Sequence, residues 1–140
     1  MALPNKLTLE VVTPDVALVR ADVDEVQVPG SEGYLGILPG HTPLLAMLKI
    51  GELWYRIGAE QHYLAIAGGF VEVLPVRVTV LAQLAERAQD IDVSRAEAAR
   101  KRAEDRLATP QIDMDVERAR IALLKSLIRL QVASRARTRV

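Results

Sequence analysis

The sequence predicts an all-β sandwich of about ten antiparallel strands, followed by a C-terminal hairpin of two α-helices. All eight glycines and six of the seven prolines lie before residue 86, among short β-branched runs. After that point Gly is absent, and Ala, Glu, Arg and Leu dominate, which is a helical composition. We therefore expect a sandwich domain over residues 1–85 and a helical hairpin over residues 86–140.

The sandwich prediction rests on nine apolar runs that Pro and Gly separate at intervals typical of antiparallel β-proteins. The runs are Leu7–Thr13, Val16–Ala21, Val23–Val28, Tyr34–Leu38, Leu44–Leu48, Glu52–Ile57, Gln61–Ala67, Phe70–Leu74 and Val76–Leu81. In the last run, valines alternate with polar residues, as in a strand with one buried face. The tripeptide Gly68-Gly69-Phe70 predicts a tight turn or a bulge where strands approach closely.

The helical part contains start and stop signals. Ser94-Arg95-Ala96-Glu97 matches a capping box, with Asp90 and Asp92 just upstream, and predicts a helix that runs to about Leu107. Thr109-Pro110 breaks this helix, because the residue before a proline avoids helical backbone angles. Asp113 or Asp115 can cap a second helix that extends to about Ala133.

The two helices are expected to form an antiparallel hairpin, because about five residues join them. Small alanines at positions 96, 99 and 103 would allow close approach, and the second helix carries one apolar stripe of Val116, Leu123, Leu127 and Leu130. So short a pair cannot bury its apolar faces alone. It is either a docked appendage or a mobile arm with more than one docking site, and the residue pattern leaves both interpretations open.

No catalytic or metal-binding constellation appears, so the chain is not expected to be an enzyme. There is no cysteine, no Walker-type phosphate loop, no Gly-x-Ser-x-Gly motif and no nucleophile–base pair. His41 and His62 lack metal-ligand spacing. No apolar stretch approaches the roughly 20 residues of a membrane-spanning helix. The N-terminus lacks the features of a signal or transit peptide, and we expect the protein to work in the compartment where it is made.

The formal net charge of zero hides a gradient. Residues 1–85 have a net charge of −4, residues 86–112 are balanced, and residues 113–140 have a net charge of +4. The basic C-terminal segment is expected to meet an acidic partner or to fold back on its own acidic body. Nucleic acid is a weaker interpretation, because the segment has no interleaved aromatic residues and the body would repel phosphate.

Three stretches together resemble the epsilon subunit of bacterial F-type ATP synthases. The first is residues 28–45, VPGSEGYLGILPGHTPLL; the second is residues 68–73, GGFVEV, followed by residues 78–82; the third is residues 85–96, AERAQDIDVSRA. The first stretch is highly specific, and the resemblance covers essentially the whole chain. The family's architecture, a β-sandwich followed by a two-helix hairpin, is also what the residue pattern predicts independently.

The resemblance implies a non-catalytic rotor subunit on the cytoplasmic face of the bacterial plasma membrane. The sandwich would touch the gamma subunit and the c ring, with Glu32, Tyr34 and His41 in the contact region, and would help to couple proton or sodium flow to ATP synthesis. The hairpin would switch between a compact and an extended state that restrains ATP hydrolysis. Basic residues of the second helix, Arg118, Arg120 and Arg135, would meet an acidic loop of the beta subunit.

The third stretch is also similar to the ATP-binding signature of some bacterial members. The candidate residues are Glu86, Asp92, Arg95, Arg102, Lys125 and Arg129. No cofactor is required, and ATP would act as a regulatory ligand. Arg95 and Arg102 lie about 10 Å apart on one helix face, and a closed hairpin could bring Lys125 and Arg129 to the same phosphates. The alternative is that Asp92 only caps the helix and that the arginines form surface ion pairs.

Two other functions compete with this interpretation. One is a free-standing β-sandwich interaction module with a helical tail, which the composition permits and the first stretch disfavours. The other is a small-molecule enzyme, which the lack of a nucleophile–base pair disfavours.

Overall fold

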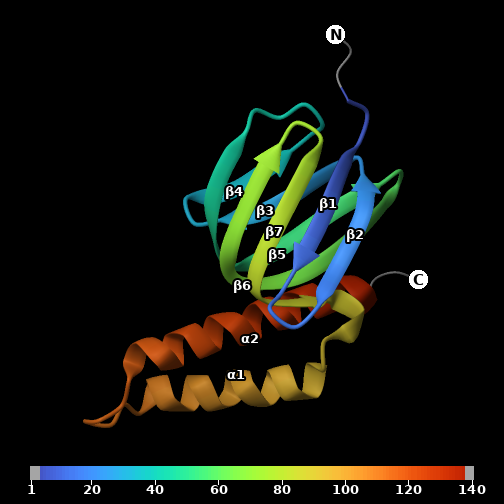
Figure 1. Ribbon diagram of the computed structural model, residues 1–140. Helices are drawn as coiled ribbons and strands as arrows, with labels where there is room; N and C mark the ends of the chain where they lie inside the picture. The colour runs from blue at the N-terminus through green and yellow to red at the C-terminus, as the bar shows by residue number, and fades with distance from the viewer. Residues whose placement is uncertain (1–3, 138–140) are drawn as a thin grey trace. The chain divides into compact units, whose positions relative to one another are not determined.

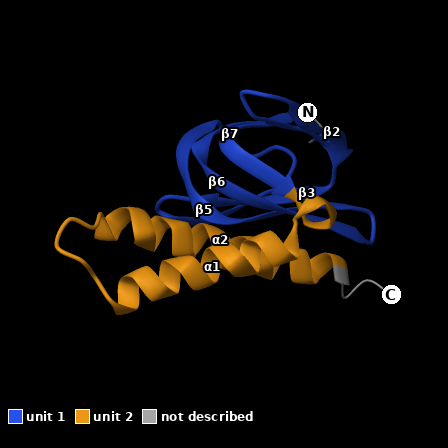
Figure 2. Ribbon diagram, turned by 90° about the horizontal axis from the view of Figure 1, so that it is seen from below, with its two compact units in different colours: residues 1–86 blue, residues 87–140 orange. Residues whose placement is uncertain are grey.

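The computed structural model describes residues 4–137. The chain divides into two compact units, residues 1–86 and residues 87–140 (Figure 2), and each is described by itself below. Among the described residues, no helix has both the length and the apolar composition needed to cross a membrane.

The first unit is a seven-stranded sheet that folds over on itself around a core (Figure 1). The strands are β1 Leu7–Val12, β2 Ala17–Val23, β3 Glu25–Gly30, β4 Gly33–Ile37, β5 Leu44–Ile57, β6 Glu60–Leu74 and β7 Arg77–Arg87. They are hydrogen-bonded in the order β2-β1-β7-β6-β5-β3-β4. The predicted sandwich class is confirmed, but the number of strands is seven instead of about ten.

The difference arises because two pairs of predicted runs join into single long strands. The runs Leu44–Leu48 and Glu52–Ile57 both belong to β5, and the runs Gln61–Ala67 and Phe70–Leu74 both belong to β6. Continuous antiparallel pairing of β5 with β6 satisfies the backbone groups through the apparent gaps. The expectation of purely antiparallel pairing was also wrong, because β1 pairs with β7 in parallel.

Gly68 and Gly69 lie inside β6, where both have a positive φ. The register with β5 is the same on either side of them, so the predicted tight turn does not form and the pairing with β5 contains no bulge. Gly69 has a φ of 123°, and a Cβ built on it would lie 2.1 Å from the backbone oxygen of Leu81 in β7. A side chain at this position would therefore prevent the two strands from approaching. The core consists of aliphatic side chains only, among them the fully buried Leu7, Leu53 and Ile66.

The second unit begins with a short 3-10 helix, Ala88–Asp90, and continues as α1, Val93–Ala108, and α2, Val116–Arg137. The helical hairpin is thus confirmed. The predicted capping box at Ser94 was wrong: Asp92 is the N-cap, and its side chain accepts a hydrogen bond from the backbone N–H of Arg95. Asp115 makes the equivalent bond to the N–H of Arg118 and caps α2.

The contact between the helices uses small side chains spaced seven residues apart. They are Ala96 and Ala103 on α1 and Ala119, Ser126 and Ala133 on α2, and all are buried, as is the larger Val132 near the end of α2. The apolar stripe predicted on α2 is not the buried face of this helix, because Val116 and Leu127 remain 40% and 43% exposed. Small residues occupy these positions because they let two helix backbones come close, whereas leucines would hold the backbones apart.

Candidate functional site

One edge of the hairpin brings together most of the predicted nucleotide-binding residues. Arg95 and Arg102 each immediately precede a buried alanine of α1, and Lys125 immediately precedes the buried Ser126 of α2. In two antiparallel helices, residues that precede their contact positions by one point to the same edge of the pair. Arg129, one turn beyond Lys125, lies on this edge too. We call this side of the hairpin the cationic edge.

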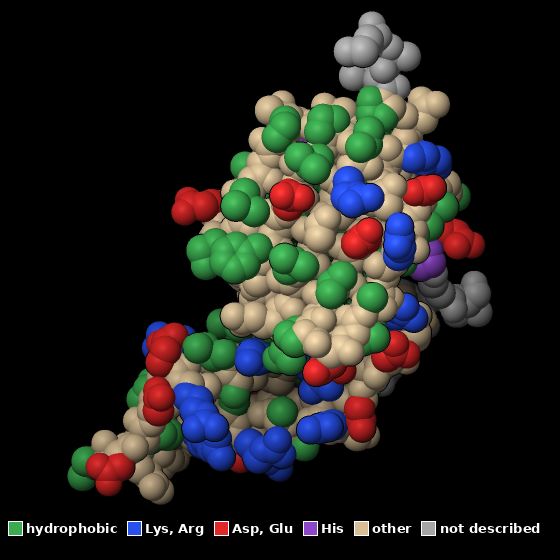
Figure 3. Space-filling view, viewed as in Figure 1, with side chains coloured by type: hydrophobic (Ala, Val, Ile, Leu, Met, Phe, Trp, Pro, Cys, Tyr) green, Lys and Arg blue, Asp and Glu red, His purple; other side chains and the backbone are tan. Residues whose placement is uncertain are grey.

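The cationic edge has two more members that the sequence interpretation did not assign to it. Arg106 lies four residues after Arg102, and Arg118 immediately precedes the buried Ala119. The signal for them is a shared spacing: Arg95, Arg102 and Arg106 repeat at intervals of seven and four residues, as do Arg118, Lys125 and Arg129. Figure 3 shows Lys and Arg side chains gathered over the helical unit.

The charges on this edge are largely unneutralised. Within residues 4–137, Arg95, Arg102, Arg106, Arg118 and Lys125 form no ion pair, whereas Arg129 does have a polar or charged partner. The opposite edge of α1 differs, because Arg100 bridges Glu97 at 2.7 Å and Glu104 at 2.9 Å. These two glutamates hydrogen-bond the Arg100 guanidinium and raise its pKa above the usual value. The alternative of surface ion pairs thus describes Arg100, and does not describe Arg95, Arg102 or Lys125.

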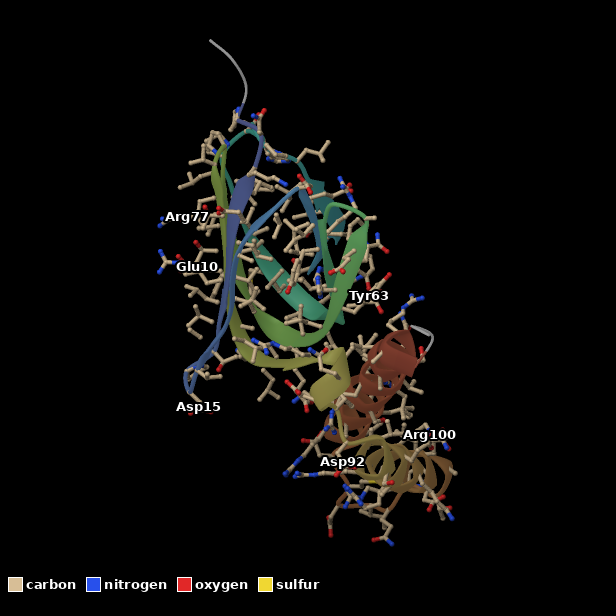
Figure 4. The ribbon with its side chains drawn as sticks, turned by 90° about the vertical axis from the view of Figure 1, so that its right-hand side faces the viewer. Glu10, Asp15, Tyr63, Arg77, Asp92 and Arg100 are labelled. Atoms are coloured by element: carbon tan, nitrogen blue, oxygen red, sulfur yellow. The ribbon has the colours of Figure 1, made fainter. Side chains whose placement is uncertain are left out.

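Asp92 stands at the start of α1, where it is exposed (Figure 4). One carboxylate oxygen, Oδ1, accepts the capping hydrogen bond at 3.1 Å. For the other oxygen, no hydrogen bond occurs within the described part of the chain, so Asp92 can cap the helix and still accept a bond from a ligand. Glu86 is the last residue of the first unit and lies one residue before the end of β7, and it has a partner within the described chain.

The cations expected to meet a beta subunit point in different directions. Arg118 belongs to the cationic edge, whereas Arg120 follows Ala119 on the other edge and pairs with Glu117 at 3.2 Å. Arg135 is exposed near the end of α2 and has a partner within the described chain. Arg139, part of the basic C-terminal segment, lies outside the described residues.

In the first unit, Glu32 lies in the turn before β4, Tyr34 lies in β4 and His41 lies in the loop before β5, and these two segments lie near the first half of β5. The N–H of Ser31 donates to the carbonyl of Met47, while His41 lies three residues before β5 begins. Glu32 and Tyr34 are exposed, and His41 is half-buried with Nδ1 2.6 Å from the carbonyl oxygen of Thr42. This contact with the backbone of the next residue gives His41 a structural role within the loop.

The described residues hold no group of three or more His, Cys, Asp or Glu side chains suited to a metal ion. They do offer a cationic edge for an anion, and exposed apolar and polar turns for a partner protein. These properties are those of a binding protein.

Comparison with known proteins identifies the family. Residues 6–88 match the model of the β-sandwich domain of the ATP synthase delta/epsilon chain, and residues 89–134 match its long α-helix domain. The chain is 46% identical to the ATP synthase epsilon chain of Solibacter usitatus, covering 95% of this chain and 99% of that one. It is 50% identical to the epsilon chain of Syntrophobacter fumaroxidans, covering 94% and 98%.

A solved structure has the same fold. A chain of the Euglena gracilis mitochondrial ATP synthase, from a structure of OSCP, F1 and the c-ring, superposes with a TM-score of 0.80 at 22% identity, covering 98% of this chain and 84% of that chain. The matches in sequence agree with the resemblance found in the three stretches and remove the alternative of an unrelated free-standing module. This chain belongs to the delta/epsilon chain family of ATP synthase.

Proposed function

We propose that the protein is a non-catalytic central-stalk subunit of a bacterial ATP synthase, peripheral to the cytoplasmic face of the plasma membrane. It binds the gamma subunit and the c ring through the sandwich and meets the beta subunit through the hairpin. Family membership supports the assignment, and solved relatives come from assemblies with a central stalk and c-ring. In this role the protein helps to couple ion flow to ATP synthesis.

The observation that carries a regulatory role is the composition of α2. Beyond the face that packs on α1, α2 has exposed apolar side chains: Ile121, Leu124 and Leu127 are 37–46% exposed. A helix that is apolar on several sides requires more than one packing partner. The hairpin therefore acts as an arm that leaves its compact position and inserts α2 into the catalytic head, where it restrains ATP hydrolysis.

Truncation tests this role. A chain that ends after Ala108 keeps all seven strands of the first unit and removes α2. We expect the complex assembled with it to hydrolyse ATP faster than the complex with the full chain. Unchanged hydrolysis under every nucleotide and ion-gradient condition would mean that the hairpin is not the inhibitor.

ATP is the ligand that the cationic edge fits best. Guanidinium groups of Arg95, Arg102 and Arg129 present paired N–H donors to phosphate oxygens, and Lys125 adds a point charge. Asp92 has a free acceptor for the amino group of adenine, and Glu86, at the end of β7, completes the candidate set. Only a closed hairpin presents both helices to one ligand, so ATP favours the compact state by its differential affinity.

Calorimetry on the full chain tests ATP binding. Arg95→Ala should weaken binding severely, and Lys125→Arg should strengthen it through bidentate contact. The matched control is Arg100→Ala, an arginine of the same helix that faces the opposite edge and is already paired. The absence of heat at several millimolar ATP would leave Asp92 as a helix cap and nothing more.

The segments with Glu32, Tyr34 and His41 form the contact of the sandwich with the c ring or gamma. Both segments lie near the first half of β5, and Leu38, Leu44 and Leu45 nearby are exposed. Single cysteines at the three positions should cross-link to gamma or to the c ring in the assembled enzyme. Cross-links to the beta subunit alone would contradict the assignment.

A further inference from the structure

The acidic first unit has five Lys and Arg side chains, and two of them stand apart. Lys6 pairs with Asp24, Arg20 with Glu10, and Arg56 with both Asp24 and Glu25. Within the described residues, neither Lys49 nor Arg77 forms an ion pair. Both are exposed, and Arg77 projects from the start of β7 (Figure 4).

Lys49 differs from Arg77 because its position is held by an aromatic ring. Its Nζ lies 4.9 Å from the centroid of the Tyr34 ring, within the range of a cation–π contact. The Tyr34 hydroxyl lies close to Gly51 of β5, 3.1 Å from the position of a Cβ built there. The ammonium group is therefore oriented without being neutralised.

The surroundings of Lys49 leave it open to a partner. Met47 lies on the same face of β5 and is 59% exposed, and its partner in the sheet, Phe70, is 48% exposed. Leu48 of β5 pairs with Gly69 of β6, and Ile50 of β5 pairs with Ala67 of β6. Gly68 is therefore the residue of β6 that lies opposite Lys49. Gly68 has no side chain, so no side chain of β6 lies opposite Lys49, and the Gln83 side chain of β7 lies over Gly68 instead.

We propose that Lys49 binds a carboxylate of an acidic, partly apolar segment of the gamma subunit, and so determines where that segment lies on the face formed by Met47 and Phe70. The inference rests on the proposed central-stalk function. Residues 1–85 have a net charge of −4, so an unpaired cation among them offers a local site for an acidic segment and selects against a basic one. The apolar neighbours contribute contact area, and Lys49 fixes the position of the bound segment along this face.

The test measures binding of the full chain to a purified complex of gamma with the catalytic subunits, at low and at high salt. Lys49→Met keeps the aliphatic stem over Tyr34 and removes the charge. We expect it to weaken binding about two- to fivefold at low salt, the range of an exposed ion pair, and to reduce the salt dependence. Lys49→Glu should weaken binding more than Lys49→Met, and Tyr34→Leu should weaken it by releasing the ammonium group. Arg77→Met is the matched control and should bind as the wild type does.

The outcomes are distinguishable. If the wild-type chain does not bind the complex at all, the proposed central-stalk function fails. If the wild type binds and Lys49→Met binds with the same affinity and salt dependence, only the role of Lys49 is refuted. An equal loss of affinity for Arg77→Met would indicate a general charge effect and would also overturn the inference. The inference would fail likewise if Lys49→Met changed hairpin closure in the isolated chain without changing binding.

Discussion

Replacing Ala103 by leucine should open the hairpin. Ala103 is 2% exposed and lies on the buried face of α1, and α2 likewise buries the small residue Ala119. Leucine adds three carbon atoms at a contact that only small side chains occupy. Inserting extra methylene groups into a packed interface typically costs about 1–3 kcal/mol. Since about 1.4 kcal/mol is a factor of ten, the ratio of closed to open hairpin should fall about 5- to 150-fold.

Hydrogen exchange measured by mass spectrometry on the full chain detects this change, because opening exposes the backbone amides of α1 and α2. The matched control is Ala98→Leu, which makes the same substitution in the same helix at an exposed position. The difference in helix propensity between Ala and Leu is therefore common to both variants. Faster exchange in α2 for Ala103→Leu, with unchanged exchange for Ala98→Leu, is the expected result.

Equal exchange in the two variants would mean that the seven-residue spacing of small residues does not hold the helices together.

A second measurement connects the hairpin to its ligand. If only the closed state binds ATP, the apparent dissociation constant rises as the closed fraction falls. Ala103→Leu should then bind ATP more weakly than Ala98→Leu does.

Three further predictions concern single positions. Asp92→Ala should destabilise α1 by about 1 kcal/mol, the usual cost of an N-cap, measured as lost helicity by circular dichroism. The pKa of Asp24 is lowered mainly by a hydrogen bond from Lys6 and next by one from the backbone amide of Gly58. The ionised Asp24 therefore stabilises the fold above its unfolded pKa of about 3.9. This stabilisation is lost as the pH falls through the folded pKa. Asp24→Asn should thus lower the urea midpoint at pH 7 and flatten its decline in acid; an unchanged pH profile would contradict the assignment. Gly69→Ala should destabilise the sandwich by at least about 3 kcal/mol through backbone strain and collision with β7, whereas Gly36→Ala, which meets nothing within 4 Å, should be tolerated in the same thermal unfolding assay.

Local chemistry in the sequence was sufficient for the fold class and the helix ends. The confinement of glycine and nearly all proline to the first 85 residues excludes long helices there, because both residues destabilise helix interiors. The break at Thr109-Pro110 and the caps at Asp92 and Asp115 act within a few residues of the chain. Even so, the choice of Asp92 over Ser94 as the cap depended on where the first turn of α1 begins.

Strand number, the parallel pairing of β1 with β7 and the buried face of α2 depended on tertiary structure. Gly51 suggests a break between two runs, yet β5 continues through it because β3 and β6 pair with the residues on both sides of Gly51. The apolar stripe of α2 is visible in the sequence, but the helix contacts α1 through Ala119 and Ser126, since close approach of backbones outweighs the apolar area of a leucine.

The candidate nucleotide site divides in the same way. The residues that could bind phosphate were predictable from the sequence, because guanidinium and ammonium groups are recognisable from their chemistry alone. Whether those groups share one edge was decided by the hairpin, since Arg95, Arg102, Arg118 and Lys125 each precede a buried small residue and so point to the same edge. Charge is a property of the residue, whereas convergence is a property of the packing between two helices that are distant in sequence.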